Sequence, residues 1–322
     1  MIDEYNPLSA SRVASGVVNP VTGRRVVATW MIDELLPYAI NAYHDIGNDL
    51  GYKLATEINM VNFHTSEQMQ AAWHSRVAEG CEYISKLNNT HSYDDYFSIQ
   101  HGIGLTHPCL LINLDLLLSA WRQKLIAQRS LLEERFNIED IHYIGEKVLY
   151  KNIEADKLIL CNGVAGFDNK YFSRLPYTFN KGEALILQIK GLPPSAIYKY
   201  GISLVPLGDD MFWVGSSFEW EYDDEAPSTA FRNNIETTLN KWLKLPYKVL
   251  EHKASVRPAS IERRPFVGLH PAFPSIGIFN GMGTKGCSLA PYFAAQFADS
   301  LTTGSKIHPE VDISRFQKSL CL

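Results

Sequence analysis

A glycine-rich motif near the C-terminal end of the chain has the composition of a ligand-binding loop. It reads Gly281-Met282-Gly283-Thr284-Lys285-Gly286, and so matches the pattern GxGxxG. An apolar stretch from Ser275 to Asn280 precedes it and predicts a strand, and a helical pattern from about Ser288 to Leu301 follows. Glycines at such a junction let the N–H groups of the helix N-terminus approach an electron-rich group. The loop is therefore a candidate cofactor site, with Gly281, Gly283, Thr284, Lys285 and Gly286 as the contacts.

The same motif has three possible interpretations. It can bind the diphosphate of a dinucleotide, it can use glycines only for close helix–strand packing, or it can direct a helix N-terminus at another electron-rich group. A dinucleotide unit requires a further strand that ends in an acid about 20 residues after the glycines. Glu310 has nearly that spacing, but no strand pattern precedes it. The third interpretation is therefore favoured.

The first residues, Met1-Ile2-Asp3-Glu4, form a short apolar segment that ends in acids. In a dinucleotide-binding unit, an acid at the end of the second strand binds a ribose hydroxyl, which makes Asp3 a candidate ribose contact. Taken alone, the segment is more typical of an exposed acidic N-terminus.

Composition excludes several functional classes. The 322 residues carry 30 Lys and Arg against 35 Asp and Glu, a net charge of −5 that argues against nucleic-acid binding. No apolar run reaches the roughly 18 residues of a membrane span, and the N-terminus has no secretory pattern. The five cysteines include no CxxC pair, which predicts reduced thiols, a cytoplasmic protein and no metal site. Asn88-Asn89-Thr90 has the form of a glycosylation sequon, which matters only for a secreted chain.

The order of the elements predicts an α/β chain with two domains. Helical patterns cover Met31–Leu50, Thr65–Leu87, Leu114–Phe136 and Thr229–Leu245, and Lys157–Cys161 has the pattern of a buried strand. Residues 183–256 are rich in strands, with a hairpin turn at Gly208-Asp209-Asp210. We expect a Rossmann-like domain with a parallel sheet, assembled from residues 1–30, 110–180 and 255–322, and an inserted, largely antiparallel α+β substrate domain from 31–109 and 181–254.

Five segments together resemble the D-amino-acid oxidase and glycine oxidase superfamily of FAD enzymes. Ser11 to Pro20 is similar to the serine- and alanine-rich segment that runs along the flavin, and Ala155 to Gly163 to the second flavin-binding strand. Lys181-Gly182-Glu183 resembles the opening of the family's substrate-domain sheet. The segment from Arg257 to Gly268 resembles its Arg-Pro…Pro-Ile-Gly signature, and the segment from Asn280 to Pro291 resembles its final glycine loop and helix. Two departures are Cys161 before Asn162-Gly163, and Glu262 where the family has Asp.

The resemblance implies an FAD site. Besides Asp3 and the glycine loop, it assigns cofactor contacts to Ser11, Arg12, Ala14, Ser15, Gly16, Asn162 and Gly163. In the family the last loop faces the flavin ring and not the diphosphate. Backbone N–H groups from Gly283 to Gly286, with the charge of Lys285, would stabilise the negative charge of reduced flavin.

The resemblance also implies a reaction. The family oxidises amines, usually amino acids, by hydride transfer from the carbon beside the amine to flavin, followed by imine hydrolysis. Arg257 matches the arginine that binds the substrate carboxylate, and bidentate binding favours Arg over Lys. Tyr198 lies in the strand that lines the substrate in glycine oxidase-like relatives. We therefore expect Arg257, Tyr198 and Lys285 in the catalytic site, with FAD as cofactor and a small amine or amino acid as partner.

A competing hypothesis is a non-catalytic or truncated flavin-domain relative that acts as a binding or assembly subunit. The resemblance begins at the ribose acid, so the family's first strand, glycine finger and first helix are expected to be absent from residues 1–322. That helix N-terminus would bind the diphosphate, and its loss predicts weak FAD binding. The sequence does not predict the oligomeric state.

Overall fold

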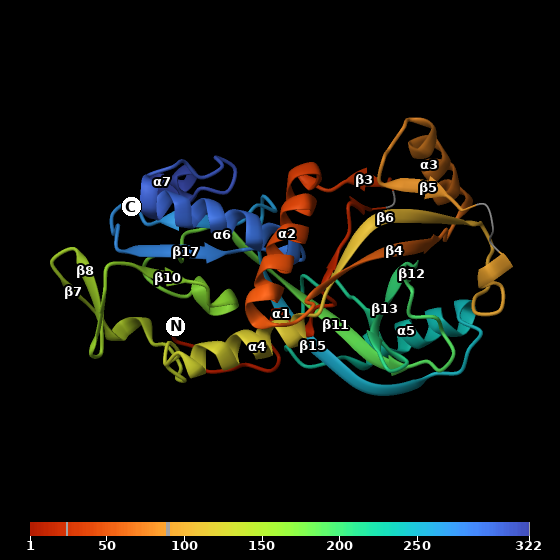
Figure 1. The fold of residues 1–322 in the computed structure, drawn as a ribbon, viewed down its shortest axis with the longest axis horizontal. Coiled ribbons are helices and arrows are strands. Elements are labelled where there is room, and N and C mark those ends of the chain that lie inside the picture. Colours follow the sequence, from red (N-terminus) through yellow and green to blue (C-terminus); the bar gives the residue numbers. More distant parts are fainter. Residues whose placement is uncertain (24, 88–90, 322) are drawn as a thin grey trace.

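Two β-sheets, each covered by helices, form the two ends of the elongated molecule (Figure 1). This computed structural model describes residues 1–23, 25–87 and 91–321, so the sequon at 88–90 lies outside the described residues. The helices are α1 (Ala10–Val13), α2 (Ile32–Leu50), α3 (Glu67–Ala78), α4 (Leu114–Ala127), α5 (Thr229–Trp242), α6 (Gly286–Thr303) and α7 (Gln317–Leu320).

The larger sheet has nine strands and mostly antiparallel pairing. They are β1 (Val17–Val18), β4 (Ala55–Phe63), β5 (Ile84–Lys86), β6 (Ile103–Ile112), β11 (Tyr177–Gln188), β12 (Ala196–Tyr200), β13 (Ile202–Gly208), β14 (Met211–Gly215) and β15 (Lys248–Ser260). The order is β1-β6-β4-β12-β13-β14-β11-β15, with β5 paired to β6, and β4 and β12 run parallel. Asp209 and Asp210 have φ of 50° and 56° at the β13–β14 turn, which confirms the predicted hairpin.

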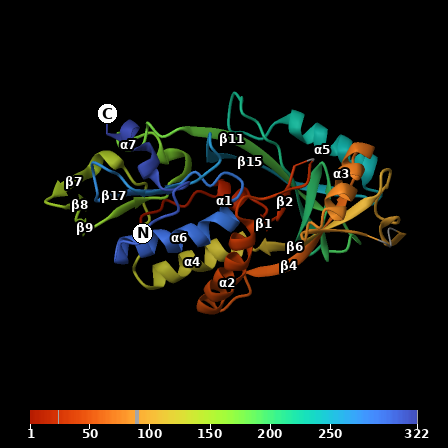
Figure 2. The same cartoon turned by 90° about the horizontal axis from the view of Figure 1, so that it is seen from above.

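The smaller sheet contains the parallel pair that the sequence predicts. It has the order β10 (Leu158–Leu160), β17 (Ile276–Asn280), β16 (Phe266–Leu269), and β10 runs parallel to β17. Helix α6 packs on one side of it through Phe293 and Leu289, and α2 and α4 lie on the same side of the molecule (Figure 2). A three-stranded meander of β7 (Ile141–Ile144), β8 (Lys147–Tyr150) and β9 (Ile153–Ala155) contributes to the core on the other side. The strands β2 (Val21–Thr22) and β3 (Val27–Ala28) form a separate small hairpin.

The predicted fold class is confirmed, but two helices are shorter than predicted. Helix α3 begins after Ser66, whose Oγ accepts from Met69 N, yet it ends at Ala78 because Gly80 adopts a left-handed φ of 82°. The residues that follow form β5, so the predicted continuation to Leu87 is wrong. Helix α4 ends at Ala127, well before Phe136.

Both faces of the large sheet are buried, by different partners. Odd-numbered residues of β11 join Leu204, Val214 and residues of α5 in one core. Even-numbered residues of β11 join Ile197 and Trp213 on the opposite face, which meets the N-terminal segment. None of the described helices is long and apolar enough to cross a bilayer. The domain boundaries stay a prediction, because α2 of the expected substrate domain packs against α6 and α4.

Candidate active site

The N-terminal segment lies across the face of the large sheet opposite α5. Trp213 Nε1 donates to the carbonyl of Val13 at 2.8 Å, and Ser255 Oγ donates to the carbonyl of Leu8 at 2.7 Å. A small cavity remains between this segment and the sheet, and Arg257 lines it. The segment expected beside the flavin and the arginine expected to bind substrate are therefore neighbours.

Arg257 is a half-buried cation in β15. Its Nη1 donates to Asn180 Oδ1 at 2.8 Å and to the carbonyl of Ser217 at 3.2 Å. Burial lowers the pKa of Arg257 to about 10, and no carboxylate lies within ion-pair distance of it in residues 1–23, 25–87 and 91–321. A partly desolvated guanidinium without an anion is a costly arrangement that an anionic ligand would relieve.

Gly182 allows the guanidinium to lie against β11. A Cβ added to Gly182 would lie only 1.7 Å from Arg257 Nη2. The Lys181-Gly182-Glu183 motif therefore has a steric reason for its glycine. Any larger residue at 182 would displace the arginine.

Residues Ser216–Ser228, which we call the strap, cover Arg257 from the other side. The Phe218 ring centroid lies 5.2 Å from Arg257 Cζ, and Lys181 and Glu219 exchange two backbone hydrogen bonds of 2.9 and 3.0 Å. Buried Glu183 connects to both ends of the strap, since its N–H donates to Ser217 Oγ at 2.9 Å and its Oε2 accepts from Ser228 N at 2.6 Å.

The glycine loop is attached to the strand that carries Arg257. Gly283 N–H donates to the carbonyl of Pro258 at 2.9 Å, and Met282 forms a β-bridge with Ala259. Gly281 has φ of 76°, and a Cβ there would lie 2.8 Å from the Phe266 ring. The loop and the first turn of α6 thus lie beside the strand that carries Arg257.

The carboxyl ends of β10 and β17 meet beside this loop. Asn280 Nδ2 donates to the carbonyl of Gly163 at 2.8 Å, and Asn280 Oδ1 accepts from Gly281 N at 2.8 Å. Gly163 has φ of 59°, and Asn162 before it is exposed. Ligands of open α/β sheets bind at such strand ends.

Two lysines without an acid partner approach the same region from both sides. They are Lys285, at the N-cap of α6, and Lys199, in β12. Desolvation and then Lys199 lower the pKa of Lys285 to about 8, and desolvation lowers the pKa of Lys199. No carboxylate in the described part of the chain contributes to the pKa of either lysine, so both can serve an anionic ligand.

The remaining predicted residues differ in their placement. Gly16 packs tightly, since a Cβ would lie 2.0 Å from the carbonyl oxygen of Ile112. Asp3 Oδ1 lies 2.5 Å from Arg122 Nη1, so its carboxylate already has a cation. Ser15 is half-buried, and half-buried Arg12 lies over the Tyr5 ring at 4.6 Å. Exposed positions are Ser11, Ala14 and Thr284.

Tyr198 is not brought to this site. It is 1% exposed in the core shared with α5, and its hydroxyl donates to the carbonyl of Pro193 at 2.7 Å. Because side chains alternate along a strand, the adjacent Lys199 lies on the same face as Ile197, the face on which Arg257 and Trp213 line the small cavity. Lys199, Asn180 and Phe218 were not predicted from the sequence. Asn180 lies two residues before Gly182 and so on the same face of β11, which strand alternation could have indicated, whereas Lys199 and Phe218 have no such signal.

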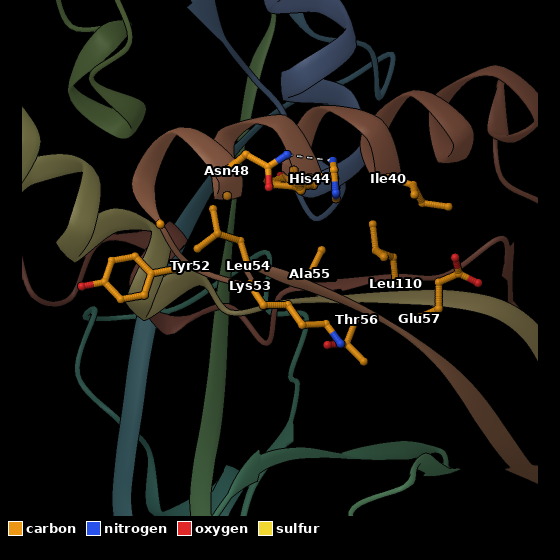
Figure 3. A pocket seen from close by; sticks show the side chains of 13 residues that line it. Ile40, His44, Asn48, Tyr52, Lys53, Leu54, Ala55, Thr56, Glu57 and Leu110 are labelled. Atoms are coloured by element: carbon orange, nitrogen blue, oxygen red, sulfur yellow. Dashed lines mark hydrogen bonds between the residues drawn. The ribbon is translucent and has the colours of Figure 1, made fainter.

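A larger cavity lies elsewhere. It measures about 750 Å³ and lies between α2 and the start of β4 (Figure 3). His44 and Asn48 of α2 contact each other at 3.2 Å, and Lys53 and Glu57 line the opposite wall. It contains neither Arg257 nor the glycine loop, and no group of three metal-ligating side chains occurs in the described residues.

Comparison with known proteins connects this geometry to a family. The family model described as DAO, FAD dependent oxidoreductase, matches residues 1–300. Glycine oxidase from Geobacillus kaustophilus superposes with a TM-score of 0.78 at 13% identity, covering 98% of this chain and 90% of that chain. Iminodiacetate oxidase from Chelativorans sp. superposes with a TM-score of 0.72 at 16% identity, covering 98% of this chain and 91% of that chain. L-alpha-glycerophosphate oxidase from Mycoplasma pneumoniae, with FAD bound, superposes with a TM-score of 0.66 at 15% identity, covering 96% of this chain and 89% of that chain.

Proposed function

Since this chain belongs to the DAO family of FAD-dependent oxidoreductases, we propose that it oxidises the C–N bond of an amino acid or related amine that carries a carboxylate. The observation that supports this substrate class is Arg257. It is a half-buried guanidinium with no carboxylate beside it among the described residues, and it lies beside the glycine loop. The proposed partner is accordingly a small molecule.

The residues around the loop fit a flavin. Gly281 and Gly283 have φ of 76° and 55°, and the packing of Gly281 on Phe266 leaves no room for a side chain. We propose that the loop from Gly281 to Gly286 contacts the flavin ring, that Ser11 to Gly16 run along it, and that Asn162 and Gly163 contact the cofactor at the end of β10. These glycines let the backbone come close to a planar ligand.

Bound FAD would supply the acceptor for the hydride that leaves the carbon beside the amine. Arg257 would hold the substrate carboxylate and so fix the orientation of that carbon. The first-turn N–H groups of α6 and the ammonium of Lys285 would stabilise negative charge on the reduced ring. With a pKa of about 8, Lys285 carries its charge at neutral pH.

Replacing Arg257 tests the assignment. In flavin-loaded protein, Arg257→Met should lower kcat/KM for carboxylate-bearing amines by roughly 30- to several-thousand-fold, because it removes a charge pair from a partly desolvated site. Arg257→Lys is the matched control, and should recover part of the loss through its point charge but not the bidentate geometry. Unchanged kinetics over an amino-acid panel would exclude the carboxylate role.

A visible absorption spectrum separates this function from that of a binding or assembly subunit. An enzyme of this class should bind FAD and lose its visible flavin bands when reduced by its substrate. A chain that binds no flavin under saturating FAD would favour the subunit hypothesis.

A further inference from the structure

Asn180 carries an unsatisfied hydrogen-bond donor next to Arg257. It lies in β11, directly opposite Arg257 in the β15 register, and is 3% exposed. Its Oδ1 accepts from Arg257 Nη1, whereas its Nδ2 is buried and has no acceptor among residues 1–23, 25–87 and 91–321. A guanidinium has donors only, so the amide cannot be reversed without placing two donors against each other.

The unsatisfied donor requires an explanation, because buried polar groups nearly always have hydrogen-bond partners. The other buried asparagine of this sheet obeys that rule, since Asn62 Nδ2 donates to Thr106 Oγ1 at 2.9 Å and to the carbonyl of Met60 at 3.1 Å. Asn180 and Arg257 are thus adjacent side chains whose donors exceed the acceptors around them. The Asn180 amide nitrogen has two N–H donors and the guanidinium has five, of which Nη1 donates to Asn180 Oδ1 and to the carbonyl of Ser217.

A carboxylate supplies two oxygens on one carbon and matches this pair. We infer that Asn180 is a second substrate-binding residue, whose Nδ2 donates to one oxygen of the substrate carboxylate while Arg257 donates to the other. This inference rests on the proposed function. The guanidinium provides charge and the amide provides a directional hydrogen bond. Amines without a carboxylate would leave Asn180 Nδ2 without an acceptor and Arg257 without a counter-ion, and are rejected.

Kinetics of Asn180→Ala give the first test. The KM for carboxylate-bearing amines should rise about 10-fold, since one hydrogen bond is lost, with kcat changed less than roughly two-fold. Asn62→Ala is the matched control, because it removes a buried asparagine from the same sheet, and its KM should stay at the wild-type value. A KM unchanged in Asn180→Ala would overturn the inference.

An NMR titration of the FAD-loaded protein with acetate separates ligand contact from mere support of Arg257. The side-chain amide signal of Asn180, assigned by its loss in Asn180→Ala, should move downfield as acetate binds, and should not move in Arg257→Met. A signal that stays in place while acetate binds to wild type would contradict the inference.

The two proposals fail in different ways. If Arg257→Met lowers kcat/KM and Asn180→Ala does not change KM, the proposed function holds and the role of Asn180 is wrong. If Arg257→Met has no effect on carboxylate substrates, the proposed function is itself wrong.

Discussion

At the scale of single residues, the protonation of Lys285 makes the free energy of unfolding depend on pH. Burial, with Lys199 second, lowers the pKa of Lys285 to about 8 in the folded chain, whereas an unfolded lysine has a pKa near 10.4. Between these values the unfolded chain binds a proton that the folded chain lacks. The free energy of unfolding therefore rises with pH from about 8 to about 10.4, and below pH 8 the full cost of the buried charge remains.

Lys285→Met should remove that cost. We expect the flavin-free variant to be more stable at pH 7, by on the order of 2 kcal/mol, and its stability to depend less on pH between 8 and 10. Denaturant titrations at several pH values measure both effects. Lys190→Met, at an exposed lysine, is the control and should retain the wild-type slope. Equal slopes in wild type and Lys285→Met would contradict this assignment.

Whether the position of a site residue could be predicted depends on how far apart in the sequence its contacts lie. The glycine loop and Arg257 were found because their neighbours in the chain carry the pattern, and the structure places them together. Tyr198 was misplaced because both faces of β12 are buried, so alternation alone does not tell which face meets the ligand. The ion pair of Asp3 joins residues 119 apart and has no local signal.

At the scale of elements, one buried carboxylate holds the strap. Glu183 is 0% exposed, binds Ser228 N, and has Lys181 Nζ at 3.6 Å and His252 Nε2 at 2.8 Å. Removing one charged member of such a buried group leaves its partners unpaired, which lowers the free energy of unfolding by about 3–5 kcal/mol. The strap contains the exposed residues Asp223 to Pro227, where a protease can cut once the strap detaches.

Glu183→Ala should therefore speed proteolytic cleavage within residues 223–227 and raise the KM for carboxylate substrates, since the strap also positions Ser217 against Arg257. Limited proteolysis with mass spectrometry locates the cut. Glu221→Ala removes an exposed carboxylate of the same strap and should behave like wild type. Cleavage first at another loop would show that Glu183 supports the fold in general and not the strap.

Elements were predicted well where the turn chemistry is local. The β13–β14 hairpin follows from Gly208-Asp209-Asp210, and α6 follows from the glycine loop before it. The ends of α3 and α4 were predicted too far along the chain. In α3 the reason is tertiary, because Ile84–Lys86 gain strand partners in β6 that the helical pattern does not reveal.

At the scale of the whole molecule, the proposed cofactor would lie where the two sheets meet. The N-terminal segment contacts the large sheet through Val13 and Leu8, and the glycine loop joins the small sheet to β15. A ligand at this junction binds the folded chain and not the unfolded one. FAD should therefore raise the melting temperature, with about 2.7 kcal/mol of added stability at one hundred times its Kd.

Calorimetry with increasing FAD measures this shift. Riboflavin, which has the ring without the diphosphate, is the control ligand and should stabilise less if the end of β10 also contacts the cofactor. Arg257→Met should show the same FAD shift as wild type, because its proposed partner is the substrate. A melting temperature independent of FAD would mean that the junction does not bind it.

The hydrogen bond from Trp213 to Val13 also gives the protein a built-in optical probe. The indole lies against the segment proposed to run along the flavin and lines the same cavity as Arg257. Tryptophan emits in the near-ultraviolet range where flavins absorb, so a bound ring would quench Trp213 by energy transfer. The difference in emission between the wild-type chain and Trp213→Phe then reports whether the cavity is filled, without any knowledge of the substrate.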